Sequence, residues 1–189
     1  RVYLSSGDVK QAQVILEKLL IQSVNFDQST SSLALSLSIK ESLGYCYILS
    51  GKQAKGLALV KSSIYEKLNN QRIAMTTLGP DYDDFTRKIL QLGKSKEAQE
   101  LNEERYKAAQ KYGTHSVQYI STAQSLGNYF SDVGNFEGSI ALLQEVYSIS
   151  SRRNGLDNQL TLELLLDLAE IHEQLGLHKK SLKLVGKAY

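Results

Sequence analysis

The sequence predicts an all-α fold, a solenoid of antiparallel helix pairs with about four to five repeats. Five glycines recur at steps of 44, 42, 41 and 42 residues, at Gly7, Gly51, Gly93, Gly134 and Gly176. The chain contains one proline and no tryptophan, which suits a helix-rich protein. A fixed period in this range on a helical background is typical of a repeat array rather than of a single-core globule.

Other positions repeat in register with these glycines. The residues five positions after them are small: Ala12, Gly56, Ala98, Ser139 and Ser181. The residues seven positions before the last four glycines are Gly44, Thr86, Gly127 and Ala169. We expect each glycine to end a first helix by taking φ > 0, and the small residues to let the two helix backbones approach closely.

The helices follow from this register. Second helices are expected at about Val9–Val24, Gln53–Thr76, Phe136–Arg152 and His178 to the end, and first helices at about Ser32–Leu49, Asp81–Leu92, Ser116–Asp132 and Asn158–Leu175. Asp27, Ser29 or Thr30 is expected to cap the helix that leads to Leu49.

The third unit is irregular because Gly79-Pro80 lies unusually close to the next turn glycine, Gly93. Proline breaks a helix interior but fits the first helical turn. We therefore expect a short first helix after Pro80 and a long helix before it, with one kinked helix as the alternative.

These recurring positions resemble the sequence pattern of the tetratricopeptide repeat family. The best matches are LGNYF at 126–130 with GNFEGS at 134–139, and LGYCY at 43–47 before Gly51. Ordinary repeats of this family span about 34 residues. The longer steps, and the segments LGPD at 78–81 and YGTH at 112–115, are more similar to kinesin light chain repeats. The resemblance covers nearly the whole chain and implies a right-handed superhelix that binds protein partners.

We expect residues 1–189 to form a single repeat domain that is a fragment of a longer protein. Residues 1–6 have the pattern of the end of a first helix, and Tyr189 falls inside a second helix. Natural arrays usually end in a capping element with a polar outer face. Neither end shows one, so the array is expected to be truncated at both ends.

Composition and motifs argue against several functions. A net charge of +2 gives no case for nucleic acid, and no apolar run approaches the roughly 20 residues that span a bilayer. No nucleotide loop or catalytic motif is present, so we expect a non-enzyme without cofactor or metal. Cys46 and His172 are expected to be packed core residues.

The candidate site is the inner wall of the superhelix, which the first helices line according to the resemblance. On the last first helix, Glu163, Asp167 and Glu170 are spaced to share one face. The other expected groove residues are Glu41, Ser42, Tyr45, Ile48, Asp83, Asp84, Gln124, Ser125, Asn128, Ser131, Asp132, Leu166, Glu173 and Gln174. Lysines fall mostly on second helices: Lys55, Lys61, Lys67, Lys96, Lys107, Lys180 and Lys183.

An acidic-polar inner wall favours a basic peptide or helix of a partner protein. The predicted contacts are Asn128, Glu163, Asp167 and Glu170, with Asp83, Asp84, Tyr45 and Ser125 as weaker candidates. The wall lacks the lysine pair of chaperone-adaptor relatives and the basic groove of kinesin light chains.

Three alternatives stay open. In the first, the acidic face is only solvated and binds no partner. In the second, the array is a structural or self-associating module that joins through its ends. In the third, it is a peptide-sensing domain attached to an effector. A cytoplasmic location is expected in each case, because the single cysteine fits a reducing compartment.

Overall fold

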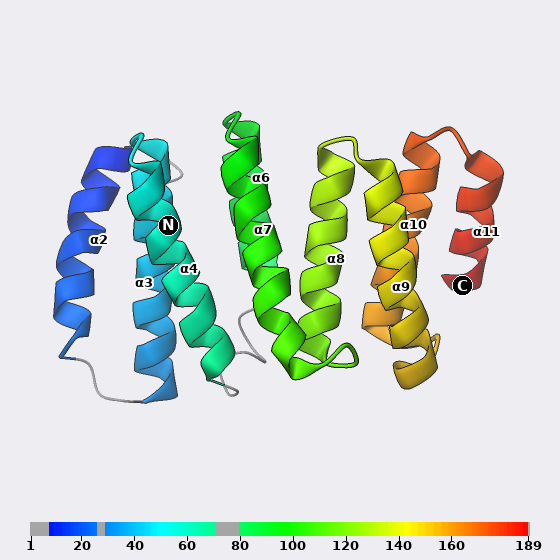
Figure 1. Ribbon diagram of the computed structural model, residues 1–189, viewed down its shortest axis with the longest axis horizontal. Coiled ribbons are helices and arrows are strands. Elements are labelled where there is room, and N and C mark those ends of the chain that lie inside the picture. The colour runs from blue at the N-terminus through cyan, green and yellow to red at the C-terminus, as the bar shows by residue number, and fades with distance from the viewer. Residues whose placement is uncertain (1–7, 26–28, 71–79, 189) are drawn as a thin grey trace. The chain divides into compact units, whose positions relative to one another are not determined.

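The computed structural model describes residues 8–25, 29–70 and 80–188, without the side chains of residues 68, 80–82, 84, 85 and 188. Gly7 lies outside these residues. Every regular element in the described ranges is helical (Figure 1). The elements are α2 (Val9–Ser23), α3 (Thr30–Leu49), α4 (Gln53–Asn69), α6 (Pro80–Gln91), α7 (Ser95–Ala109), η1 (Gln110–Tyr112), α8 (Val117–Asp132), α9 (Phe136–Asn154), α10 (Gln159–Gln174) and α11 (His178–Ala188).

The four described turn glycines end first helices as predicted. Gly51, Gly93, Gly134 and Gly176 have φ between 70° and 81°. At the turn between α8 and α9, Gly134 N donates to Ser131 O at 2.9 Å and Asn135 N donates to Phe130 O at 2.8 Å. This pair of bonds defines a Schellman motif, and the same pair recurs at the other three glycines.

Polar caps fix where the helices begin. Ser29 Oγ accepts from Ser32 N at 3.2 Å, which selects Ser29 among the three predicted caps of α3. Ser116 and Asn158 cap α8 and α10 in the same way, through Tyr119 N and Leu160 N. Pro80 is the first residue of α6, as expected for a residue without an N–H.

The helix before Pro80 is shorter than predicted. Helix α4 ends at Asn69, and Asn70 takes an extended conformation with φ −105° and ψ 101°. The prediction that this helix runs to Thr76 is therefore wrong, because the backbone leaves helical geometry at residue 70. Residues 71–79 lie outside the described part of the chain.

The small-residue columns bring paired helices together. A Cβ placed on Gly44 of α3 would lie 2.9 Å from Gly56 O on α4, and one on Gly56 would lie 2.5 Å from Gly44 O. In the equivalent positions of the α8–α9 pair, Ser139 Oγ donates to Gly127 O at 2.7 Å. The predicted backbone approach is confirmed in both pairs.

The helices group into two compact units, Arg1–Glu104 and Arg105–Tyr189, with the boundary inside α7. In the first unit α3 packs against α2 and α4. One groove prediction is wrong here, because Ile48 is fully buried. Glu41 pairs with Lys67, which was expected on the outer wall. Helix crossing places Lys67 Nζ 2.7 Å from Glu41 Oε2, and Lys67 is 5% exposed.

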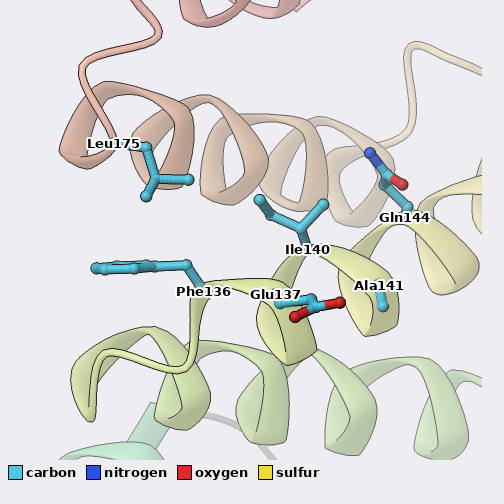
Figure 2. A pocket seen from close by; sticks show the side chains of 6 residues that line it. All are labelled: Phe136, Glu137, Ile140, Ala141, Gln144 and Leu175. Carbon is cyan, nitrogen blue, oxygen red and sulfur yellow. The ribbon is translucent and has the colours of Figure 1, made fainter.

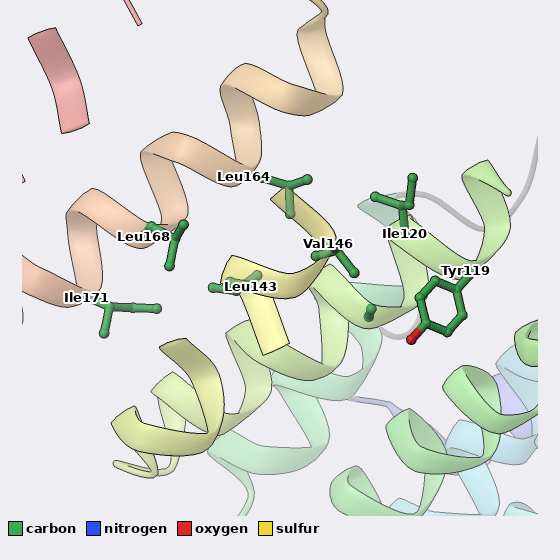
Figure 3. Packing of buried hydrophobic residues seen from close by; sticks show 8 residues of the cluster. Tyr119, Ile120, Leu143, Val146, Leu164, Leu168 and Ile171 are labelled. Atoms are coloured by element: carbon green, nitrogen blue, oxygen red, sulfur yellow. The ribbon is translucent and has the colours of Figure 1, made fainter. Parts of the chain in front are cut away.

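In the second unit α8, α9, α10 and α11 alternate in direction, and each packs on its sequence neighbours (Figure 1). Their buried cluster joins Tyr119 and Ile120 of α8 to Leu143 and Val146 of α9 and to Leu164, Leu168 and Ile171 of α10 (Figure 3). Three successive helices therefore share one core, as a repeat array requires. This core holds α8 and α10 in a fixed register.

Candidate functional site

Helices α8 and α10 are joined by amide–carboxylate bonds on the polar side of their shared core. Asp167 Oδ2 accepts from Gln124 Nε2 at 2.7 Å and from Asn128 Nδ2 at 3.2 Å. One turn after Asn128 on α8, Ser131 Oγ donates to Gln174 Oε1 of α10 at 3.3 Å. The predicted candidates Asn128 and Asp167 therefore lie together, on adjacent first helices.

Two further candidates flank Asp167 on α10. Glu163 and Glu170 are exposed, and each accepts one amide hydrogen from its own helix, from Gln159 and Gln174 respectively. Among the described residues neither carboxylate forms an ion pair with lysine or arginine. Their charge is therefore not neutralised within this part of the fold.

Asp167 differs from its neighbours because it is half-buried. Burial raises the pKa of Asp167 above its usual value, and the charges of Glu170 and Glu163 raise it further. The hydrogen bonds from Gln124 and Asn128 lower this pKa, but by less than burial and the two neighbouring charges together raise it. The pKa shift thus reports a partly dehydrated face that already carries negative charge.

The weaker candidates are placed less favourably. Ser125 is buried, and its Oγ donates to Ser121 O at 3.0 Å, so its hydroxyl is satisfied within α8. Tyr45 and Asp83 are half-buried, on α3 and α6. The side chain of Asp84 lies outside the described part of the structure.

A pocket of about 350 Å³ opens where the first halves of α8 and α10 meet the end of α9. Its lining consists of Val117, Ser121, Asn154, Asn158, Gln159, Leu160 and Glu163. Glu163 belongs both to this pocket and to the acidic face of α10. The pocket is called the α8–α10 pocket below.

Sequence reasoning missed most of the α8–α10 pocket. Asn154 ends α9 and Asn158 caps α10, and only the turn at Gly155 brings the two together. The segment NGLDN at 154–158 signals a turn, but a turn signal does not reveal which helix faces it. Val117 and Ser121 carry no signal of their own.

A second, more apolar pocket of about 510 Å³ lies between α9 and the end of α10 (Figure 2). In Figure 2, Phe136 and Ile140 of α9 lie on the side of Leu175, which follows α10, and Glu137, Ala141 and Gln144 complete the lining. Specific ligand sites combine apolar walls with several polar groups that fix orientation. This pocket offers only Glu137 and Gln144, so its lining does not define a ligand.

The residues with reactive side chains occupy structural positions. Cys46 is fully buried, and burial raises the pKa of its thiol to about 11. His172 is also buried, as predicted. The described residues include no group of three or more histidine, cysteine, aspartate or glutamate side chains placed to hold a metal ion.

None of the helices in the described ranges is long and apolar enough to cross a membrane. Several large apolar side chains are exposed on α2 or directly after it, including Ile21 and Val24, and Leu182 is exposed on α11. Such side chains are compatible with association through the array ends, which stays a prediction.

The fold and turn geometry define a helical repeat protein. Residues 119–189 match the family model of the tetratricopeptide repeat. The sequence matches no curated protein significantly.

The fold is shared with two solved repeat proteins. A protein from Podosopora anserina, described as a putative kinesin light chain with nearly identical TPR-like repeats, is 19% identical, with a TM-score of 0.59 over 100% of this chain and 88% of that one. BtubC (BKLC) from P. vanneervenii is 15% identical, with a TM-score of 0.57 over 98% and 74% of the two chains. The predicted resemblance to kinesin light chain-type tetratricopeptide repeats is therefore confirmed. Repeats of this kind generally mediate protein–protein interaction and typically belong to scaffolds rather than enzymes.

Proposed function

We propose that this chain is a protein-interaction scaffold that binds a basic peptide segment of a partner along the acidic face of α8 and α10. The observation that carries the proposal is the pair of exposed carboxylates, Glu163 and Glu170, which have no lysine or arginine partner among the described residues. Exposed, unneutralised charge on a surface fixed by a rigid core is suited to complementary charge on a ligand.

Asp167 supports this face rather than acting alone. Its carboxylate is occupied by Gln124 Nε2 and Asn128 Nδ2, so it holds the two helices in register. The carbonyl oxygen of the Asn128 side chain remains an acceptor for a peptide N–H. We therefore assign direct charge pairing to Glu163 and Glu170, and positioning to Asp167 with Asn128.

The proposal is tested by fluorescence anisotropy with three labelled 12-residue peptides of alanine and serine. They carry four lysines, four glutamines or four glutamates. We expect only the lysine peptide to bind, and its affinity to fall as salt rises because surface charge pairing is screened. Binding that does not distinguish the three peptides would contradict the proposal.

A matched pair of variants locates the site. Glu163→Gln/Glu170→Gln removes two charges from the proposed face, while Glu103→Gln/Glu137→Gln removes two exposed charges from α7 and α9. Both changes shift the net charge equally. We expect the first variant to lose most of the lysine-peptide affinity and the second to keep it. Equal losses would mean that only overall charge matters.

A further inference from the structure

The α8–α10 pocket offers hydrogen-bond acceptors that no described residue engages. Asn154 Nδ2 donates to Ser150 Oγ at 3.2 Å, and Gln159 Nε2 donates to Glu163 Oε1 at 2.9 Å. Among the described residues no hydrogen bond engages Asn154 Oδ1, Gln159 Oε1 or Glu163 Oε2. The orientation of the Gln159 amide follows from its partner, since only the NH₂ group can donate to Glu163.

Among the other lining residues, Asn158 caps a helix, and Val117 and Leu160 supply apolar surface. Asn158 Oδ1 accepts from Leu160 N at 3.1 Å, so this amide serves the start of α10 and satisfies a helix N–H that would otherwise attract an anion. Val117 is 53% exposed and Leu160 is half-buried. The pocket therefore combines apolar contact surface with acceptors and one carboxylate.

Charges near the pocket have both signs. Arg152 and Arg153 end α9 beside Asn154, and Arg152 Nε donates to Ser148 O at 2.9 Å, which holds its guanidinium against its own helix. Asp157 lies in the following turn, and Asp167 lies one turn beyond Glu163 on α10. Glu163 is the only charged residue in the lining itself.

We infer that the α8–α10 pocket receives one cationic side chain, lysine or arginine, of the bound peptide, with its aliphatic stem on Val117 and Leu160 and its charge on Glu163. This inference rests on the proposed function, because the peptide lies along the same face. An ammonium or guanidinium group supplies only donors, which matches the acceptors left by Asn154, Gln159 and Glu163. A volume of about 350 Å³ leaves room for one such side chain.

The test is a methyl NMR titration of the chain with the four-lysine peptide, followed at Val117 and Leu160. Parallel peptides carry arginine, norleucine or citrulline in place of every lysine. We expect the Val117 and Leu160 methyl signals to shift with the lysine and arginine peptides. The neutral analogues, which keep the stem and lose the charge, should leave both signals unmoved.

Two isosteric variants separate the pocket from the rest of the face. Glu163→Gln removes the pocket's carboxylate, and Glu170→Gln removes an equal charge two turns along α10. We expect Glu163→Gln to lose roughly tenfold in affinity for the lysine peptide, as for a charge-assisted hydrogen bond, and to lose the Val117 and Leu160 methyl shifts. Glu170→Gln should keep those shifts.

The outcomes distinguish a failure of the proposed function from a failure of the pocket assignment. If the lysine peptide does not bind at all, the proposed function fails and the inference fails with it. If the peptide binds but the two methyl signals stay unmoved and Glu163→Gln behaves like Glu170→Gln, the proposed function stands and the pocket assignment is overturned. Shifts induced by the four-glutamate peptide instead would also overturn it.

Discussion

Asn128 Nδ2 on α8 lies 3.2 Å from Asp167 Oδ2 on α10, and that oxygen also accepts from Gln124 at 2.7 Å. One carboxylate oxygen thus connects two successive first helices at the face proposed to bind peptide. The connection makes local stability and the charge of the face depend on the same group.

The pH dependence of stability should report Asp167. Burial raises the pKa of its carboxyl in the folded chain, so the folded state holds this proton more tightly than the unfolded state. Its contribution to stability is therefore complete below the unfolded pKa and is lost as pH rises through the raised folded pKa. The measurement is the free energy of unfolding in urea at a series of acidic pH values. Asp167→Asn should flatten this slope, and an unchanged slope would exclude Asp167 as its source.

Asp167→Ala should destabilise the chain at neutral pH. It leaves Gln124 Nε2 and Asn128 Nδ2 without their shared acceptor, which costs about 1–3 kcal/mol where the groups are dehydrated. Chemical denaturation measures the loss. Glu163→Ala is the control, because that exposed side chain bonds only to Gln159 in its own helix, and it should change stability little. Equal losses would show that Asp167 has no special structural role.

The ion pair between Lys67 and Glu41 should contribute more than the neighbouring pair between Lys40 and Glu66. Both join α3 to α4, at 2.7 Å and 2.6 Å, but Lys67 is 5% exposed while Lys40 and Glu66 are partly exposed. Glu41→Ala leaves a buried ammonium group unpaired, with an expected cost of about 3 kcal/mol. Glu66→Ala should cost about 1 kcal/mol or less.

Denaturation of these two variants side by side checks that prediction. The double variant Glu41→Leu/Lys67→Met removes both charges and should recover much of the loss, because no unpaired buried charge remains. If Glu41→Ala and Glu66→Ala cost the same, burial does not decide the strength of these pairs.

The sequence predicted those parts of the fold that depend on local geometry. The glycine column specifies turns because only a residue without Cβ takes φ near 80° without strain, as at Gly134. The column of small residues likewise predicted the approach of Gly44 and Gly56. In contrast, the Lys67–Glu41 pair depends on the rotation and crossing of two helices, which a linear pattern does not encode.

The same distinction applies to the candidate site. Heptad-like spacing placed Glu163, Asp167 and Glu170 on one helix, but it did not reveal that Asp167 is engaged by the neighbouring helix or that Ser125 is buried. The α8–α10 pocket needs the end of α9 beside two first helices, so its residues are distant in sequence. Surfaces formed between elements therefore require coordinates, while the elements themselves follow from the period.

Three glycines with different surroundings should respond differently to alanine. Gly134 has φ +80° with open space around a Cβ, so Gly134→Ala should cost about 1–2 kcal/mol through backbone strain alone. At Gly127 a Cβ would lie 2.8 Å from Leu143 Cγ, so Gly127→Ala should cost about 1–3 kcal/mol through overpacking of α8 against α9. Gly186 lies in α11 with nothing near a Cβ, so Gly186→Ala should stabilise by about 0.5–1 kcal/mol.

A second substitution separates the two causes of loss. Leu143→Ala creates space opposite Gly127, so Gly127→Ala should cost less in that background than alone, while the cost of Gly134→Ala should not change. Denaturation midpoints for the single and double variants measure this coupling. If Leu143→Ala relieves neither glycine substitution, close packing does not explain the small residue at position 127. The small residues that recur at this position of each repeat would then need another physical reason.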